Sequence, residues 1–192
     1  MTKIAILRAG SWGTALAIVL SRSRKPHEIS LWVRNAALAE AIRVDRENRA
    51  YLPGSKLPES VGVHADLEAA LSGAQVILGT MPSAHARAVY TSAIPHAAAG
   101  TTFVSATKGL EPGTHLRMSE VIAQVVAPQF ASRVAVISGP SFAAESARGE
   151  PTAVVLASRD AALAPSYRKS LPAQTFGSTP TTTFLAWSWL AR

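Results

Sequence analysis

The sequence contains no cysteine, and it is poor in charged and aromatic side chains. Of its 192 residues, 16% are charged and 6% are aromatic, whereas 48% are hydrophobic. The absence of cysteine excludes disulfide frameworks, thiolate zinc sites and cysteine nucleophiles, and it fits a reducing cytoplasm. The high apolar content supplies a sizeable core and argues against intrinsic disorder. The composition therefore indicates one globular domain or slightly more.

Long hydrophobic runs are also missing. No stretch approaches the roughly 20 apolar residues that a membrane-spanning helix needs, so we expect no membrane span. The N-terminus, Met1-Thr2-Lys3, leads directly into a short apolar run and does not resemble a secretory signal. We therefore expect a cytoplasmic protein.

Basic residues outnumber acidic ones by 19 to 12, which gives a net charge of +7. Such a balance attracts anions, either phosphates or, more broadly, nucleic acid. The basic residues are scattered, however, and are not interleaved with the aromatic side chains on which bases stack. We therefore interpret most of them as solvated surface charge and expect no nucleic-acid partner.

Short apolar runs alternate with helix-period segments along most of the chain. The runs predict strands at residues 3–7, 29–33, 60–64, 75–79, 101–105, 133–138 and 152–157. The periodic segments predict helices at 13–23, 36–46, 66–71, 84–94, 115–126 and 142–148. Near-continuous apolar strands separated by helices are typical of a sheet covered on both faces, so we expect a largely parallel α/β domain.

A glycine-containing turn lies between the first predicted strand and the first predicted helix. Dinucleotide-binding domains carry the pattern G-x-G-x-x-G at this place. Here Gly10 and Gly13 occupy the second and third glycine positions, but Arg8 stands at the first. The helix that follows can offer backbone N–H groups to a diphosphate. The alternative is an ordinary strand–helix turn that happens to hold two glycines.

The residue after the second predicted strand bears on the choice of cofactor. An acidic side chain there binds the ribose 2′-hydroxyl of NAD, whereas an arginine favours the 2′-phosphate of NADP. This residue is Arg34, so the sequence favours NADP as the cofactor, with NAD as the alternative. A single exposed arginine is also compatible with simple solvation.

Three segments, in this order, resemble the bacterial NAD(P)-dependent sn-glycerol-3-phosphate dehydrogenases. They are GSWGTALA at 10–17, ATKGLE at 106–111 and SGPSFAAE at 138–145, with support from 48–54 and 81–83. The resemblance covers residues 1–176 and implies a Rossmann-like, doubly wound domain with a mainly parallel sheet. It also implies an oxidoreductase that interconverts sn-glycerol 3-phosphate and dihydroxyacetone phosphate with NAD(P)(H) in glycerophospholipid biosynthesis. The fold alone would not indicate this substrate.

The resemblance further implies roles for individual residues. The cofactor is expected to contact Gly10, Ser11, Trp12, Gly13, Arg34, Lys108 and Ala143, and the substrate Lys108, Gly139 and Ser141. No metal is implied. Lys108 is a point charge that would polarise the C2 oxygen during hydride transfer. The segment Gly139-Pro140-Ser141 is expected to open a helix whose N–H groups bind an oxyanion. Without the family, Lys108 is an ordinary surface lysine and Pro140-Ser141 an ordinary helix start.

Arg8 departs from the family pattern. If its position needs a left-handed backbone, a residue other than glycine costs about 1–2 kcal/mol there. Its side chain also adds bulk beside the path of the diphosphate. We therefore predict weakened cofactor binding, and a tighter complex for Arg8→Gly.

Residues 177–192 do not resemble the family. The resemblance implies that family members continue into a helical domain, which supplies a general-base lysine. It also implies a homodimer for the full-length enzyme. Arg192 is the only charged residue in this segment. Deleting one nucleotide from plausible codons for the family-like segment FRLYTNDDLLGVEL reproduces residues 176–189. We therefore hypothesise that 177–192 are an out-of-frame tail, with a divergent terminus as the alternative. Because the helical domain is expected to be absent, we expect an inactive chain or a non-catalytic NAD(P)-binding remnant.

Overall fold

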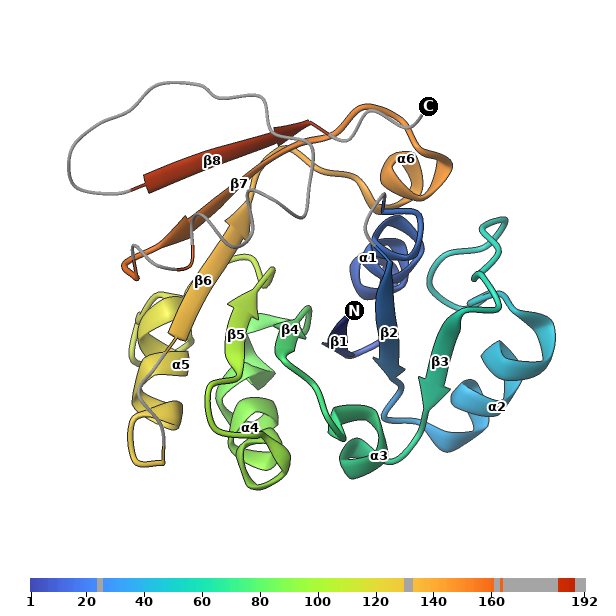
Figure 1. The fold of residues 1–192 in the computed structure, drawn as a ribbon. Coiled ribbons are helices and arrows are strands. Elements are labelled where there is room, and N and C mark those ends of the chain that lie inside the picture. The colour runs from blue at the N-terminus through green and yellow to red at the C-terminus, as the bar shows by residue number, and fades with distance from the viewer. Residues whose placement is uncertain (24–25, 130–132, 161–162, 164–182, 189–192) are drawn as a thin grey trace.

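The computed structural model describes residues 1–23, 26–129, 133–160, 163 and 183–188. Within them, one sheet has the strand order β3-β2-β1-β4-β5-β6-β7-β8 (Figure 1). The strands are β1 (Thr2–Leu7), β2 (His27–Trp32), β3 (Val61–His64), β4 (Val76–Gly79), β5 (Thr102–Ser105), β6 (Arg133–Ser138), β7 (Ala153–Ser158) and β8 (Thr183–Ser188). The helices are α1 (Ser11–Ser21), α2 (Ala36–Asp45), α3 (Leu67–Leu71), α4 (Ser83–Ala93), α5 (Met118–Val126) and α6 (Ala143–Arg148), with a short 3₁₀ helix, η1 (Ile94–His96).

The first six strands in the sequence run parallel to one another. Only β7 and β8 are antiparallel to their neighbours. The chain moves outward from β1 in one direction through β2 and β3, then returns to the other side of β1 with β4, so the strand order reverses there. This is the doubly wound, Rossmann-like topology, and its crevice for a dinucleotide lies at the reversal point. The predicted fold class is confirmed.

Helices cover both faces of the sheet, and each face has its own core. Along β1, Ile4 and Ile6 pack in the core formed with α1, α2 and α6. Ala5 and Leu7 pack in the opposite core, formed with α3, α4 and α5. Successive strand side chains point to opposite faces, so a strand buried on both faces must be apolar throughout. This explains the continuous apolar runs in the sequence.

Helix α5 and strand β8 differ from the sequence prediction. Helix α5 begins at Met118, three residues later than expected, because 110–117 form a closed loop. In that loop the Glu111 amide donates to the carbonyl oxygen of Leu116 at 2.9 Å, and His115 adopts a φ of 56°. The other difference is β8, which pairs with β7 where no regular element was expected.

The hypothesis of an out-of-frame tail remains a prediction. Residues 177–182 and 189–192 lie outside the described part of the chain, and the backbone pairing of β8 does not report on the reading frame. The DNA sequence across codon 177 tests it: the hypothesis requires the shifted frame to encode a family-like segment.

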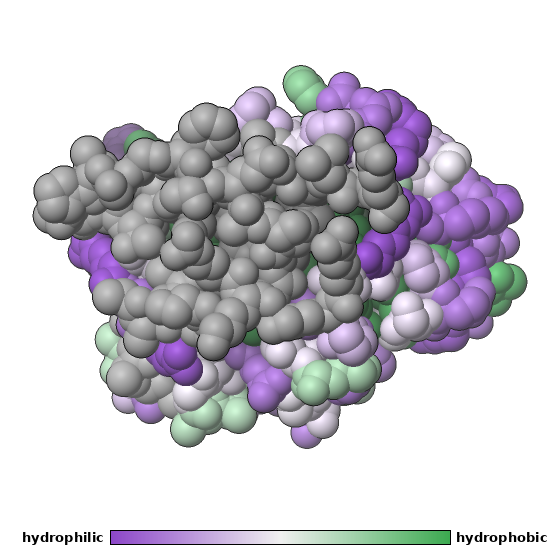
Figure 2. Space-filling model, turned by 45° about the horizontal axis from the view of Figure 1, so that its top comes forward, coloured by the Kyte–Doolittle hydropathy of each residue, from purple (hydrophilic) through white to green (hydrophobic). Residues whose placement is uncertain are grey.

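Hydrophilic residues gather on the side of the molecule that carries α2 and the segment after it (Figure 2). The basic side chains of this surface are paired with acids: Arg43 with Glu40, Arg46 with Glu59, Arg49 with Asp45 and Lys56 with Glu47. Paired charges of both signs favour the interpretation of a solvated surface. None of the helices in the described ranges is long and apolar enough to cross a bilayer.

Candidate functional site

The loops that carry the predicted site residues follow β1, β2, β5 and β6, and β4 lies between β1 and β5 in the sheet. Because these strands are parallel, their carboxyl ends lie along one edge. Ligands of doubly wound proteins bind at this edge. The fold therefore brings Lys108 and Ser141 to the edge at which α1 begins, as the sequence analysis expects.

The two glycines of the turn have different structural surroundings. Gly10 is the N-cap of α1, with φ −72° and ψ −177°, and no side chain caps the helix. A Cβ atom added to Gly10 would meet no atom within 4 Å. A Cβ atom added to Gly13 would strike the carbonyl oxygen of Arg8 and lie 2.6 Å from the Thr80 hydroxyl. Gly13 is thus required by packing within the chain, whereas the space beside Gly10 is open.

Arg8 occupies the left-handed region, with φ 84°. This confirms that the first position of the turn needs the conformation in which glycine is unstrained. The side chain is partly buried, and its Nη1 atom is fully buried without a hydrogen-bond partner in the described structure. Arg8 therefore carries both a backbone strain and an unsatisfied buried donor.

Two polar residues that sequence reasoning did not assign to the site hold the turn in place. Thr80, after β4, donates its hydroxyl hydrogen to the carbonyl oxygens of Leu7 and Arg8, at 2.9 and 2.8 Å. Asn48 is fully buried and donates to the carbonyl oxygen of Ala9. Asn48 belongs to a segment that the family resemblance included, whereas Thr80 had no sequence signal beyond its place at the end of an apolar strand.

Lys108 projects from the loop after β5 and is exposed. No described residue forms a hydrogen bond or ion pair with its ammonium group. The residues just before it are fixed: the Ala106 amide donates to the carbonyl oxygen of Gly79 at 2.8 Å, and the Thr107 hydroxyl contacts the Met81 sulfur at 3.5 Å. A free cation on an anchored loop is suited to bind an anionic or polarised oxygen.

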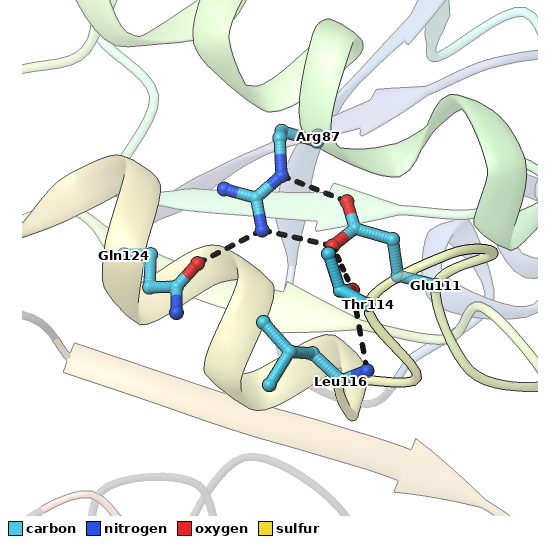
Figure 3. A network of polar contacts seen from close by, with 5 residues as sticks. All are labelled: Arg87, Glu111, Thr114, Leu116 and Gln124. Atoms are coloured by element: carbon cyan, nitrogen blue, oxygen red, sulfur yellow. Dashed lines mark hydrogen bonds and ion pairs between the residues drawn. The ribbon is translucent and has the colours of Figure 1, made fainter.

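A polar network anchors the same loop on the other side of Lys108 (Figure 3). Arg87 on α4 donates from Nε and Nη2 to the two carboxylate oxygens of Glu111, at 2.8 and 2.9 Å. Thr114 donates to the same carboxylate at 2.5 Å, and Gln124 on α5 accepts from Arg87 at 2.9 Å. The hydrogen bonds from Arg87, which are the largest cause, and from Thr114 lower the pKa of Glu111 to about 2. Glu111 is therefore ionised at any working pH.

The segment before α6 corrects one expectation. Helix α6 begins at Ala143 with Phe142 as its N-cap, so Pro140 and Ser141 lie in the preceding loop and do not open the helix. Gly139 in this segment has a φ of 149°, a value that glycine adopts more readily than other residues. The Ser141 hydroxyl lies 3.4 Å from the carbonyl oxygen of Gly139. An oxyanion would thus meet Ser141 in a loop, not at a helix N-terminus.

Helix α6, which begins at Ala143, lies beside α1 (Figure 1). Arg22, at the end of α1, donates to the carbonyl oxygen of Ala147 at 2.8 Å. Trp12 and Ala143 are both partly buried against the same core. Ser11 is exposed at the first position of α1.

Arg34 lies two residues beyond β2, at the same edge of the sheet. It is exposed, and its guanidinium has no hydrogen bond or ion pair with the described residues. A cavity of about 460 Å³ lies elsewhere, between α1 and the face of the sheet that carries Ile4, Leu78 and Val104, and it reaches the amino ends of the strands at Thr2 and His27. Among the described residues, no three His, Asp or Glu side chains gather as metal ligands would.

Comparison with known proteins adds independent information. A sequence model described as "NAD-dependent glycerol-3-phosphate dehydrogenase N-terminus" matches residues 3–164. The chain is 47% identical over 164 residues to glycerol-3-phosphate dehydrogenase (NAD(P)+) of Koribacter versatilis, covering 85% of this chain and 48% of that protein. It is 46% identical over 163 residues to the corresponding enzyme of Corynebacterium glutamicum, covering 83% of this chain and 47% of that protein.

Solved structures agree with these matches. The crystal structure of glycerol-3-phosphate dehydrogenase from Coxiella burnetii is similar with a TM-score of 0.80 and 38% identity, covering 90% of this chain and 51% of that chain. A glycerol-3-phosphate dehydrogenase from Plasmodium falciparum shares the fold, with a TM-score of 0.78 at 21% identity, over 88% of this chain and 49% of that chain. The chain thus spans about half the length of the relatives it matches.

Proposed function

Because this chain belongs to the NAD-dependent glycerol-3-phosphate dehydrogenase family, we propose that it binds NADP(H) or NAD(H) at the carboxyl edge of its sheet. The observation that carries this proposal is the open space beside Gly10, at the uncapped start of α1. Uncapped N–H groups and the positive end of a helix attract a diphosphate, and a glycine lets the phosphates approach the backbone. Gly10, Ser11, Trp12 and Gly13 would hold the cofactor there, with Ala143 close by.

The proposed reaction is the interconversion of sn-glycerol 3-phosphate and dihydroxyacetone phosphate. The nicotinamide, when bound, exchanges a hydride with the substrate. In this proposal the Lys108 ammonium holds the C2 oxygen and stabilises the charge that develops on it. Gly139 and Ser141 would contact the substrate from the loop after β6. The resemblance implies that the general base is a lysine of the family's helical domain, and none of the residues named here is that base. We therefore propose that the 192-residue chain binds dinucleotide without turnover.

Arg34 is the proposed determinant of cofactor choice. It is exposed, free of acidic partners among the described residues and placed at the end of β2, where the adenosine ribose is expected. We expect NADPH to bind more tightly than NADH, and Arg34→Gln to remove the difference. If Arg34→Gln weakens both dinucleotides equally, Arg34 does not recognise the 2′-phosphate.

Titration of the 192-residue chain with NADPH and NADH, followed by nicotinamide fluorescence, tests the proposed function. We expect saturable binding, and no NADPH oxidation when dihydroxyacetone phosphate is added. If neither NADPH nor NADH binds, the proposal is refuted. Turnover would support the assigned reaction and refute the expected inactivity. A cytoplasmic location and the absence of a nucleic-acid partner are further proposals, which rest on the composition, and a homodimer of the full-length enzyme is a proposal that rests on the family resemblance alone.

A further inference from the structure

We infer that Arg87 and Glu111 are positioning residues for Lys108, because their two-bond contact fixes the loop from which Lys108 projects. The inference rests on the proposed function and adds a pair of residues to it. Arg87 is on α4 and Glu111 follows Lys108 by three residues, so the contact joins a helix to the loop.

The loop has one anchor on each side of Lys108. Before it, Ala106 contacts Gly79 at the end of β4, and Thr107 contacts Met81 in the loop that follows β4. After it, the contact from Arg87 to Glu111 joins the loop to α4, and the Glu111 amide donates to the carbonyl oxygen of Leu116 within the closed loop 110–117. The Lys108 side chain itself has no partner among the described residues, so its position depends on these two anchors.

The second anchor is built for geometry as well as charge. The Glu111 side chain is 10% exposed, and each of its oxygens accepts a hydrogen bond from a different nitrogen of Arg87. Gln124 and Thr114 hold the outer sides of the pair. An arginine in this arrangement fixes the carboxylate in both distance and orientation, which a lysine cannot do.

The experiment separates positioning from general stability by comparing two ligands. NADPH carries the nicotinamide that Lys108 is proposed to approach, whereas 2′-phospho-ADP-ribose lacks it and occupies only the remainder of the site. For Arg87→Gln and Glu111→Gln we expect about a tenfold loss of NADPH affinity, the size of one charge-assisted hydrogen bond. Affinity for 2′-phospho-ADP-ribose should remain within about twofold of wild type. Arg87→Lys should recover part of the loss.

A double-mutant comparison with Lys108→Ala tests whether the pair acts through Lys108. If the pair acts through Lys108, then Glu111→Gln has no further effect on NADPH affinity in a chain that already carries Lys108→Ala. Glu28→Gln is the matched control, because it breaks the Lys3–Glu28 ion pair at the amino ends of β1 and β2, away from the proposed site. This control should bind both ligands as the wild type does.

Equal weakening of both ligands, or an additive loss in the Lys108→Ala background, would overturn the inference. Amide hydrogen exchange over residues 106–111 provides a readout independent of ligand binding. It should be faster by about tenfold in Glu111→Gln than in wild type if an anchor is lost. If the wild type binds neither ligand, the proposed function fails, and unchanged exchange in Glu111→Gln would then also refute the anchoring of the loop.

Discussion

Asn48 donates its side-chain amide to the carbonyl oxygen of Ala9 and to the Thr14 hydroxyl, each at 2.8 Å. It thereby connects the segment after α2 to both sides of the glycine turn. Ala9 and Thr14 are buried, so no solvent replaces these bonds when the amide is removed. Asn48, together with Thr80, therefore holds the shape of the turn.

We expect Asn48→Ala to lower the free energy of unfolding by about 1–3 kcal/mol, because it leaves the buried carbonyl of Ala9 without a donor. Urea denaturation measures this change. Thr14→Val removes one of the two bonds and keeps that to Ala9, so its effect should be smaller. An Asn48→Ala chain as stable as the wild type would show that the turn holds its shape without this residue.

The two glycines should respond to substitution in opposite ways. Gly10→Thr places its Cβ in open space, and threonine caps helices about as well as glycine, so thermal stability should change little. NADPH binding should be lost, because the side chain enters the proposed diphosphate path. Gly13→Ala forces a Cβ against Arg8 and Thr80 and should cost about 1–3 kcal/mol of stability. Calorimetry and NADPH titration of both variants distinguish these effects. Unimpaired NADPH binding by Gly10→Thr would contradict the proposed site.

Arg8→Gly should make the chain more stable. Glycine relieves a left-handed strain of about 1–2 kcal/mol and removes the unpartnered Nη1 atom, while its greater freedom in the unfolded chain offsets part of this gain. We expect a net gain of about 1 kcal/mol in the free energy of unfolding. The variant should also bind NADPH more tightly because the turn is cleared. Equal NADPH affinities would refute the predicted obstruction.

Acid should weaken the contribution of Glu111 to stability. Hydrogen bonds from Arg87, the larger cause, and from Thr114 lower its pKa to about 2. In the unfolded chain the pKa of a glutamate is about 4.3. A carboxyl with a lower pKa in the folded state stabilises the fold above the unfolded value, and this contribution is lost as pH falls through the folded value. The stability difference between wild type and Glu111→Gln should therefore be constant near neutral pH and shrink from roughly pH 4.3 to about 2.

Denaturation at a series of pH values measures this difference. The Glu120 carboxyl, whose pKa is also lowered to about 2, by its contact with Arg117, titrates in the same range. Because Glu120 is present in both chains, its effect cancels in the comparison. A difference that stays constant down to pH 2 would contradict the assigned role of Arg87.

The sequence by itself determined the fold class and the order of the elements. Strands such as β1 and β4 are buried on both faces, so their side chains are apolar without interruption. Such a run can be identified in the sequence without knowledge of the neighbouring strands. Gly10, Gly13 and Arg34 were identified because each stands just after such a strand, and parallel strands end along one edge, whereas Lys108 was assigned only through the resemblance to the family. Local pattern and motif were sufficient for these.

Only the tertiary structure decided how the loops at that edge are held. Asn48, Thr80 and Arg87 act on backbone atoms or side chains that are distant in sequence, and no local pattern marks such contacts. The late start of α5 likewise depends on backbone hydrogen bonds within 110–117 that compete with helix formation there. Long-range hydrogen bonds form only after the sheet has brought the loops together. For this reason the sequence predicted the residues of the glycine turn but not Asn48 and Thr80, which hold the turn in place.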